Sequence, residues 1–333
     1  MNSSARSTRH ALVPLLVVGV GLLIVVNLLI SVWTHSLPYY QKLEKIRNSH
    51  DPNLLFVGNS LLDGRVDEKA IASVAHDHGV SYVVLNSALG ASEPPEQRLL
   101  FQYAVAKHSG IRTLVVGVFD FQLTKPDHAS VSDLTGNRMI GIDRRFSASQ
   151  VAAVYNFGMP ERAELAILRA LPMAANRANT WKYVELLRRS MSSLGMPSAA
   201  TNSMGRVADF AALEARSPQA FDAKAQEFLN HPDHFNSSYE SVFTQARKAG
   251  MNVVIVIMPM TPSHEEAFYS RPSWSQYMQS LTALANQRDI RVIDASEWFC
   301  TQRYFVDHLH MTSEAAHEFS VRLGNELSQA GSK

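Results

Sequence analysis

Short apolar runs of strand length recur along this chain, each flanked by turn or polar residues. Their apolarity is continuous rather than alternating, a pattern typical of strands covered on both faces, as in a parallel sheet. Helical patterns lie between several runs, which predicts repeated β-α units and a doubly wound, mainly parallel five-stranded α/β sheet. The predicted strands are Leu54–Gly58, Tyr82–Asn86, Thr113–Phe119, Asn252–Met258 and Ile290–Asp294. The predicted helices are Asp67–His78, Pro94–Lys107, Ser273–Gln287 and a last helix that begins near Thr312.

A long segment, roughly residues 122–236, separates the third and fourth runs and has no strand pattern. Apolar residues at helix spacing occur in Glu161–Leu171, Thr180–Leu194 and Ala208–Leu229, and prolines interrupt the pattern between them. We therefore predict a helical insertion at the carboxyl edge of the sheet. It would serve either as a cap over a site at that edge or as a docking surface.

The first forty residues contain an uncharged segment, residues 11–33, whose 23 residues exceed the roughly 20 needed to cross a bilayer as a helix. No small-x-small cleavage pattern follows, so we predict an uncleaved membrane anchor. A short basic tail (residues 1–10) precedes it, and a connector (34–53) leads to an α/β domain over 54–330. Long domains translocate largely regardless of charge, so we expect a single-pass cytoplasmic (inner) membrane protein with a periplasmic domain.

The charge balance argues against a nucleic-acid-binding protein. The chain has 31 basic and 30 acidic side chains and a net charge of +1, so no global field draws it to nucleic acid. The single cysteine, Cys300, permits no intrachain disulfide and fits either compartment.

Ser60 ends the block Gly58-Asn59-Ser60, which overlaps the end of the first predicted strand. A hydroxyl on a turn at the carboxyl end of a strand stands where an open α/β sheet presents its reactive groups. The alternative is an ordinary turn in which the glycine allows close packing and Ser60 caps the next helix. A hydroxyl becomes a good nucleophile when a base takes its proton, so the choice depends on a base elsewhere in the chain.

The segment Asp307-His308-Leu309-His310 offers that base near the other end of the chain. A turn brings a carboxylate and a histidine three residues later to the same side, whereas adjacent side chains usually point apart. We predict His310 as the general base and Asp307 as the group that orients it. Two alternatives stay open: a solvated turn capped by Asp307, and a metal site formed by Asp307, His308 and His310. No further pair with ligand spacing accompanies them, so we predict no metal and no cofactor.

The order of these blocks resembles that of the SGNH, or GDSL-type, hydrolase superfamily. Gly58-Asn59-Ser60 matches the first block of that family, Asn86-Ser87-Ala88-Leu89-Gly90 resembles the second, and Asp307-x-x-His310 matches the last. The resemblance covers about residues 53–125 and 250–328. With its N-terminal span, the chain looks like the membrane-anchored members that act on cell-envelope polymers, including the D-alanyl-transfer proteins of the DltD type and alginate acetylation proteins.

The resemblance implies a flavodoxin-like SGNH fold and a Ser60, His310 and Asp307 triad. It also implies an oxyanion hole made by the backbone N–H groups of Ser60 and Gly90, with Ala91 as the alternative to Gly90. Small residues around Gly90 let the backbone approach a ligand closely.

The third block departs from the family, because Asp120-Phe121-Gln122 follows the third strand where a side-chain amide from asparagine is expected. A carboxylate cannot donate to an oxyanion and would repel it. Asp120 would then bind an arginine or a substrate hydroxyl, and Gln122 could supply the amide. Asn59 and His308 are further possible contacts at the site.

These features predict a membrane-anchored serine esterase or O-acyltransferase that acts on acyl esters, acetyl esters above all, of a cell-envelope polymer or glycan. A membrane-bound acyltransferase is the protein partner that the resemblance implies. The alternative is a non-catalytic envelope scaffold or polymer-binding protein that keeps the fold and partners such an acyltransferase.

Overall fold

The fold is seen in a computed structural model, which describes residues 4–127, 130–134, 136–176 and 217–329. Contacts within the chain divide it into two compact units. The helical unit contains Met1–Gln41 and Ser130–Gly195, and the α/β unit contains Lys42–Ala129 and Met196–Lys333. The predicted insertion is therefore shared between the two units rather than forming one body.

The α/β unit is built on a five-stranded sheet in the order β2-β1-β3-β4-β5, and all four strand pairs are parallel. This order reverses direction between β1 and β3, as in doubly wound flavodoxin-like folds, so the predicted fold class is confirmed. Every residue of β1 and β3 is buried, as their continuous apolarity predicts. The strands are β1 Leu54–Gly58, β2 Val84–Asn86, β3 Thr113–Val118, β4 Asn252–Ile257 and β5 Ile290–Asp294.

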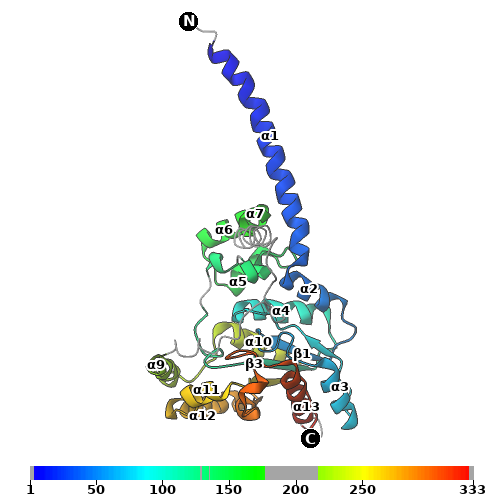
Figure 1. Cartoon of the computed structure of the whole chain (residues 1–333), viewed down its shortest axis with the longest axis vertical. Coiled ribbons are helices and arrows are strands. Elements are labelled where there is room, and N and C mark those ends of the chain that lie inside the picture. Colours follow the sequence, from blue (N-terminus) through cyan, green and yellow to red (C-terminus); the bar gives the residue numbers. More distant parts are fainter. Residues whose placement is uncertain (1–3, 128–129, 135, 177–216, 330–333) are drawn as a thin grey trace, which may run out of the picture. The chain divides into compact units, whose positions relative to one another are not determined.

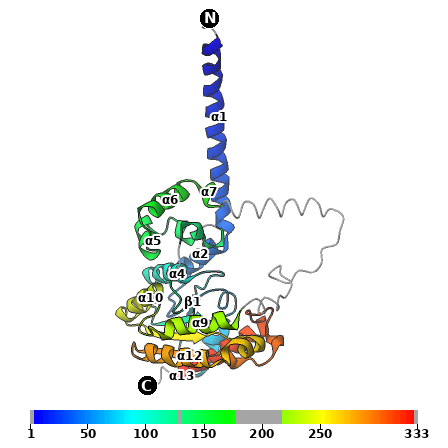
Figure 2. The same cartoon turned by 90° about the vertical axis from the view of Figure 1, so that its left-hand side faces the viewer.

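Helices cover both faces of the sheet. Figure 2 shows α4 (Pro94–Lys107) and α10 (Ser237–Lys248) above the strands, with α12 (Pro272–Asn286) and α13 (Ser313–Gln329) below them. Three of these four helices were predicted to within about one residue, whereas α10 was not predicted. The other helices of this unit are α2 Pro38–Asn48, which begins in the helical unit, α3 Glu68–Asp77, α9 Pro218–Leu229, α11 Pro262–His264, the π-helix η5 Glu265–Tyr269, and the 3-10 turns η6 Ser296–Trp298 and η7 Gln302–Tyr304.

Helix starts follow the sequence signals. Asp67 caps α3 by accepting the N–H groups of Lys69 and Ala70, and Glu93 with Glu96 forms a capping box at α4. The helices α3 and α13 approach closely at Gly324, where an added Cβ would lie 3.3 Å from Ile71 Cα. These contacts tie the two ends of the α/β unit together.

The helical unit begins with the long helix α1 (Ser4–Trp33), which Figure 1 shows in blue. Within the described residues, one segment, Leu16–Ser36, is long and apolar enough to cross a bilayer. Its mean hydropathy is 2.6, and none of its most apolar stretch is buried. The unit also contains η1 Thr34–Ser36, η2 Val131–Leu134, η3 Gly136–Ile142, α5 Ala148–Val154, α6 Met159–Ala170 and α7 Pro172–Ala175.

Of the three helices predicted in the insertion, Glu161–Leu171 is confirmed as α6, displaced by one or two residues. The second, Thr180–Leu194, lies outside the described residues. The third, Ala208–Leu229, is described in its second half, where Ser217 caps α9 and accepts the Ala220 N–H.

Candidate active site

Ser60 stands on a turn that packs tightly on β1 and β3. Gly58 and Gly117 are register partners in these neighbouring strands. An added Cβ would lie 2.9 Å from Leu62 Cδ1 at Gly58 and 2.5 Å at Gly117, so the two glycines make the room that Leu62 occupies. The Asn59 carbonyl accepts the N–H groups of Leu62 and Asp63, which holds Ser60 at the carboxyl edge of the sheet.

The loop that carries His310 is closed by an antiparallel bridge between Phe305 and Met311. Inside this loop the Asp307 carboxylate accepts the backbone N–H groups of Leu309 at 2.9 Å and His310 at 2.8 Å. The His310 ring lies against the same carboxylate, with Nδ1 at 2.9 Å from Oδ1 and 2.8 Å from Oδ2. The loop thus orients the ring as the spacing of three residues predicts.

The other ring nitrogen reaches Ser60. His310 Nε2 lies 2.9 Å from Ser60 Oγ, across 250 residues of sequence. With Nδ1–H donating to Asp307, Nε2 is left to accept the hydroxyl proton. The structure therefore brings together Ser60, His310 and Asp307 in the order that a nucleophile, a base and an orienting carboxylate require.

The charge of Asp307 is strongly favoured. Burial by itself would raise the pKa of this carboxyl, but hydrogen bonds from the His310 side chain and from the N–H groups of Leu309 and His310 outweigh burial. The net effect holds the pKa of Asp307 far below its ordinary value, so the group is ionised across the neutral range. An ionised Asp307 stabilises the imidazolium that forms when His310 takes a proton.

The predicted role of Gly90 in an oxyanion hole needs correction. Its N–H donates to Asp63 Oδ2 at 2.8 Å, and Lys42 in turn binds the other oxygen of Asp63 at 2.9 Å. Ala91, the alternative, lines the pocket and has a left-handed backbone with φ of 59°. Among the described residues, neither the Ala91 N–H nor the Ser60 N–H has a hydrogen-bond acceptor, so these two groups are the better pair of oxyanion donors.

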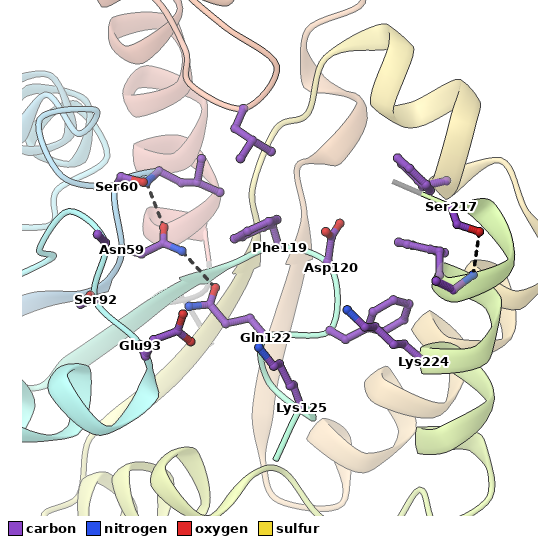
Figure 3. Close-up of a pocket in the computed structure, with 17 residues that line it drawn as sticks. Asn59, Ser60, Ser92, Glu93, Phe119, Asp120, Gln122, Lys125, Ser217 and Lys224 are labelled. Atoms are coloured by element: carbon purple, nitrogen blue, oxygen red, sulfur yellow. Dashed lines mark hydrogen bonds between the residues drawn. The ribbon is translucent and has the colours of Figure 1, made fainter. Parts of the chain in front are cut away.

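Gln122 and Asn59 lie beside these donors. Asn59 Nδ2 donates to Gln122 Oε1 at 3.3 Å, and both residues line the pocket (Figure 3). This bond engages the Gln122 oxygen, and the Gln122 amide nitrogen has no acceptor within the part of the chain that the structure describes. Gln122 therefore offers an amide N–H to a ligand in this pocket.

A pocket of about 660 Å³ opens in front of Ser60, within the range typical of small-molecule sites. The carboxyl ends of β1, β2 and β3 form one side, and α9 forms another (Figure 3). The helix α9, which lies in the predicted insertion, therefore lines this pocket. Its lining includes Asn59, Ser60, Ala91, Glu93, Asp120, Gln122, Lys125, Phe221, Lys224, Phe268 and Leu309.

Asp120 lines this pocket, where the side chains of His264 and Tyr269 meet its carboxylate. Its Oδ1 lies 2.9 Å from His264 Nε2 and accepts the Tyr269 hydroxyl at 3.0 Å. Sequence reasoning did not find His264 and Tyr269. Their position after β4 could have indicated them, because the segment that follows this parallel strand lies at the same carboxyl edge of the sheet as Asp120.

His308 lies outside the pocket lining, and its carbonyl accepts the Thr261 hydroxyl at 3.3 Å. The alternative of a metal site on this loop finds no support in the part of the chain that the structure describes, where no group of three or more His, Cys, Asp or Glu side chains has the geometry to hold a metal ion.

Comparison with known proteins gives a fold-level likeness. No family model and no curated protein sequence matches the chain. Among solved structures, a GDSL-like lipase from Bacteroides thetaiotaomicron is 10% identical, with 88% of this chain and 98% of that chain covered and a TM-score of 0.39. A carbohydrate acetylesterase from Sinorhizobium meliloti is 13% identical, with 84% and 97% covered and a TM-score of 0.35. Sequence identities and TM-scores this low do not indicate an activity. The fold is therefore assigned from the strand order, and the candidate site from its own geometry.

Proposed function

We propose that this chain is an SGNH-type serine esterase or O-acyltransferase that acts on acyl esters. The observation that supports the proposal is the 2.9 Å contact between His310 Nε2 and Ser60 Oγ, with Asp307 behind the ring and an open pocket in front of the hydroxyl. A turn serine with a merely structural role would not need a histidine held in this orientation from the far end of the chain.

In the first step, Ser60 Oγ attacks the carbonyl carbon of the ester while its proton passes to His310 Nε2. The N–H groups of Ser60 and Ala91, with the Gln122 amide, face the oxyanion that forms. His310 then gives the proton to the departing alcohol, and an acyl group remains on Ser60.

In the second step, a water molecule or an acceptor hydroxyl gives its proton to His310 and attacks the acyl carbon. The tetrahedral species collapses, Ser60 Oγ leaves and takes the proton back, and an acid or a new ester is released. Water and sugar hydroxyl use the same groups, so the two activities differ in what the pocket admits and how well it excludes water.

The proposed setting is the cell envelope. The apolar length of α1 supports a membrane anchor, and the resemblance noted in the sequence suggests an acylated glycan or envelope polymer as substrate, with a membrane-bound acyltransferase as partner. An extracytoplasmic α/β unit would meet such a polymer directly.

Hydrolysis of p-nitrophenyl acetate by the full-length protein in detergent tests the proposal. Ser60→Ala is expected to lower kcat by about 10⁴-fold or more, because the nucleophile is lost. Ser275→Ala, at an exposed serine on α12, serves as a control for the substitution itself. A wild-type protein without activity, or a Ser60→Ala protein that retains it, would favour the non-catalytic scaffold.

A further inference from the structure

Asp120 is a second chemical feature of the pocket, and the steps above make no use of it. It follows β3, whereas Ser60 follows the neighbouring strand β1, so both side chains reach the same edge of the sheet. Both line the same pocket (Figure 3). A carboxylate cannot donate a hydrogen bond to the oxyanion of an ester intermediate and repels that charge, so its presence here calls for another role.

The backbone of Asp120 is held in an unfavourable conformation. Its φ is 46°, in the left-handed region that residues other than glycine seldom adopt, although aspartate tolerates it better than most. Such conformations persist where the surrounding structure fixes them, and they concentrate at functional sites. The Asp120 N–H donates to the Tyr269 hydroxyl at 3.0 Å, which is one of the contacts that fixes it.

The carboxylate is held by two donors from one helical turn. His264 Nε2 and the Tyr269 hydroxyl meet the same oxygen, Oδ1, at 2.9 and 3.0 Å. These two residues are five apart, which in an α-helix would direct them to different faces. The intervening turn Glu265–Tyr269 is a π-helix, whose wider turn brings residues five apart to one side.

These donors are rigid. The His264 side chain is fully buried, and Tyr269 is 7% exposed with its ring stacked on Trp274 at 3.9 Å. Burial raises the pKa of Tyr269 well above its ordinary value, so the hydroxyl keeps the proton that it donates to Asp120. Thr261, which caps the helix that carries His264, also contacts the His308 carbonyl in the loop of His310.

We propose that Asp120 is a specificity residue that accepts a hydrogen bond from a hydroxyl on the alcohol side of the ester, as in a sugar or another polyol. This inference rests on the proposed esterase or transferase function. A buried His264 and Tyr269 fix one carboxylate oxygen, so the group enters the pocket pre-oriented and loses little freedom when a hydroxyl binds. In an esterase that hydroxyl belongs to the departing sugar, and in a transferase it belongs to the acceptor.

The test compares two esters of matched shape with the full-length protein in detergent. Methyl 6-O-acetyl-glucopyranoside carries ring hydroxyls, and cyclohexylmethyl acetate is its hydroxyl-free counterpart. We expect Asp120→Asn to lower the ratio of kcat/KM for the sugar ester to that for the hydroxyl-free ester by about tenfold, the size of one hydrogen bond to a charged group. Tyr269→Phe, which removes one positioning contact, is expected to lower the same ratio by less.

Asp289→Asn is the matched control, since Asp289 is also an aspartate in the left-handed region, with φ of 54°, but lies in the turn before β5. It is expected to leave the ratio unchanged. The proposal is overturned if Asp120→Asn lowers both values equally, if it leaves the ratio as it was, or if the wild type cleaves the hydroxyl-free ester but not the sugar ester. Failure of the proposed function looks different, because then neither ester is cleaved in a Ser60-dependent way.

Discussion

At the scale of single residues, the site depends on where backbone N–H groups point. Asp307 is charged because two N–H groups and a ring nitrogen converge on it, and Gly90 is unavailable as an oxyanion donor because Asp63 accepts its N–H. Both features follow from hydrogen bonds in the loops that carry the residues. Two predictions concern single carboxyl groups.

The first concerns the orienting carboxylate. Asp307→Asn keeps the shape of the loop but removes the charge and favours the wrong tautomer of His310, so kcat for p-nitrophenyl acetate is expected to fall by about 10⁴-fold. The measurement is steady-state hydrolysis, with near-UV circular dichroism to show that the fold is kept. A loss smaller than tenfold in a folded protein would mean that Asp307 does not act through His310.

The second concerns Glu265. Burial, with smaller effects from Glu297, Asp294 and Asp120, raises its pKa from 4.5 to about 8. Between these two values the native state binds more protons than the unfolded state, so the free energy of unfolding falls as the pH rises. Glu265→Gln is expected to remove this part of the decline, seen as a smaller drop in urea midpoint between pH 5.5 and pH 8.5.

The exposed neighbour supplies the control for that experiment, since Glu266→Gln makes the same chemical change one position along. It should retain the pH dependence of the wild type. An unchanged slope in Glu265→Gln would show that its carboxyl ionises normally in the folded protein.

Residue-level prediction from sequence succeeded where spacing decides geometry and failed where a distant group intervenes. Asp307 and His310 are three positions apart within one loop, and this spacing fixes their relation, so their contact could be predicted. The hydrogen bond from the Gly90 N–H to Asp63 could not be predicted, because it depends on how the turn after Ser60 packs. His264 was hidden for the same reason, since its partner Asp120 lies 144 residues away.

At the scale of elements, the sheet and its flanking helices follow from patterns that are local in sequence. Continuous apolarity marked the five strands, and helical patterns between them marked several of the flanking helices. Several elements were not predicted, among them the helices α2, α5 and α10 and the π-helical turn Glu265–Tyr269. Local propensity does not favour a π-helix, so its cause lies in the tertiary contacts of His264 and Tyr269 with Asp120.

A prediction at this scale concerns Gly117 in β3. An added Cβ would lie 2.5 Å from Leu62 Cδ1, so Gly117→Ala should displace the turn that carries Ser60. We expect a loss of about 1–3 kcal/mol in the free energy of unfolding, as for other overpacked cores, together with a fall in kcat. Urea denaturation and p-nitrophenyl acetate hydrolysis measure the two effects.

Two further variants test the cause of that loss. Gly110→Ala is the control, because its added Cβ would make an ordinary contact of 3.5 Å with the Pro52 carbonyl oxygen. In a Leu62→Ala background, Gly117→Ala should cost less free energy of unfolding than it costs in the wild type, since the clashing atoms are gone. A Gly117→Ala protein as stable and active as wild type would contradict the packing argument.

At the scale of the whole molecule, the chain combines an α/β unit that holds the site with a helical unit that begins in α1. Sequence indicated both the span and the sheet because each is a local pattern. It did not indicate that residues 130–195 group with the N-terminal helix while α9 joins the α/β unit, because such grouping depends on long-range contacts. The membrane anchor and its orientation remain predictions.

The single cysteine tests the orientation directly. Cys300 is exposed on the α/β unit, so a membrane-impermeant maleimide should modify it in right-side-out membrane vesicles and not in sealed inverted ones. Cys300→Ser gives the background in both preparations. Labelling confined to inverted vesicles would place the α/β unit in the cytoplasm, and recovery of the protein outside the membrane fraction would contradict the anchor.

The most direct test of the central claim, that Ser60 is a nucleophile activated by His310, is modification by a fluorophosphonate followed by mass spectrometry of the digested protein. We predict one adduct, on the peptide that contains Ser60, formed at a rate that falls at least 100-fold in His310→Ala because the base is lost. An unmodified wild-type protein, an adduct on another serine, or equally fast modification without His310 would contradict the account.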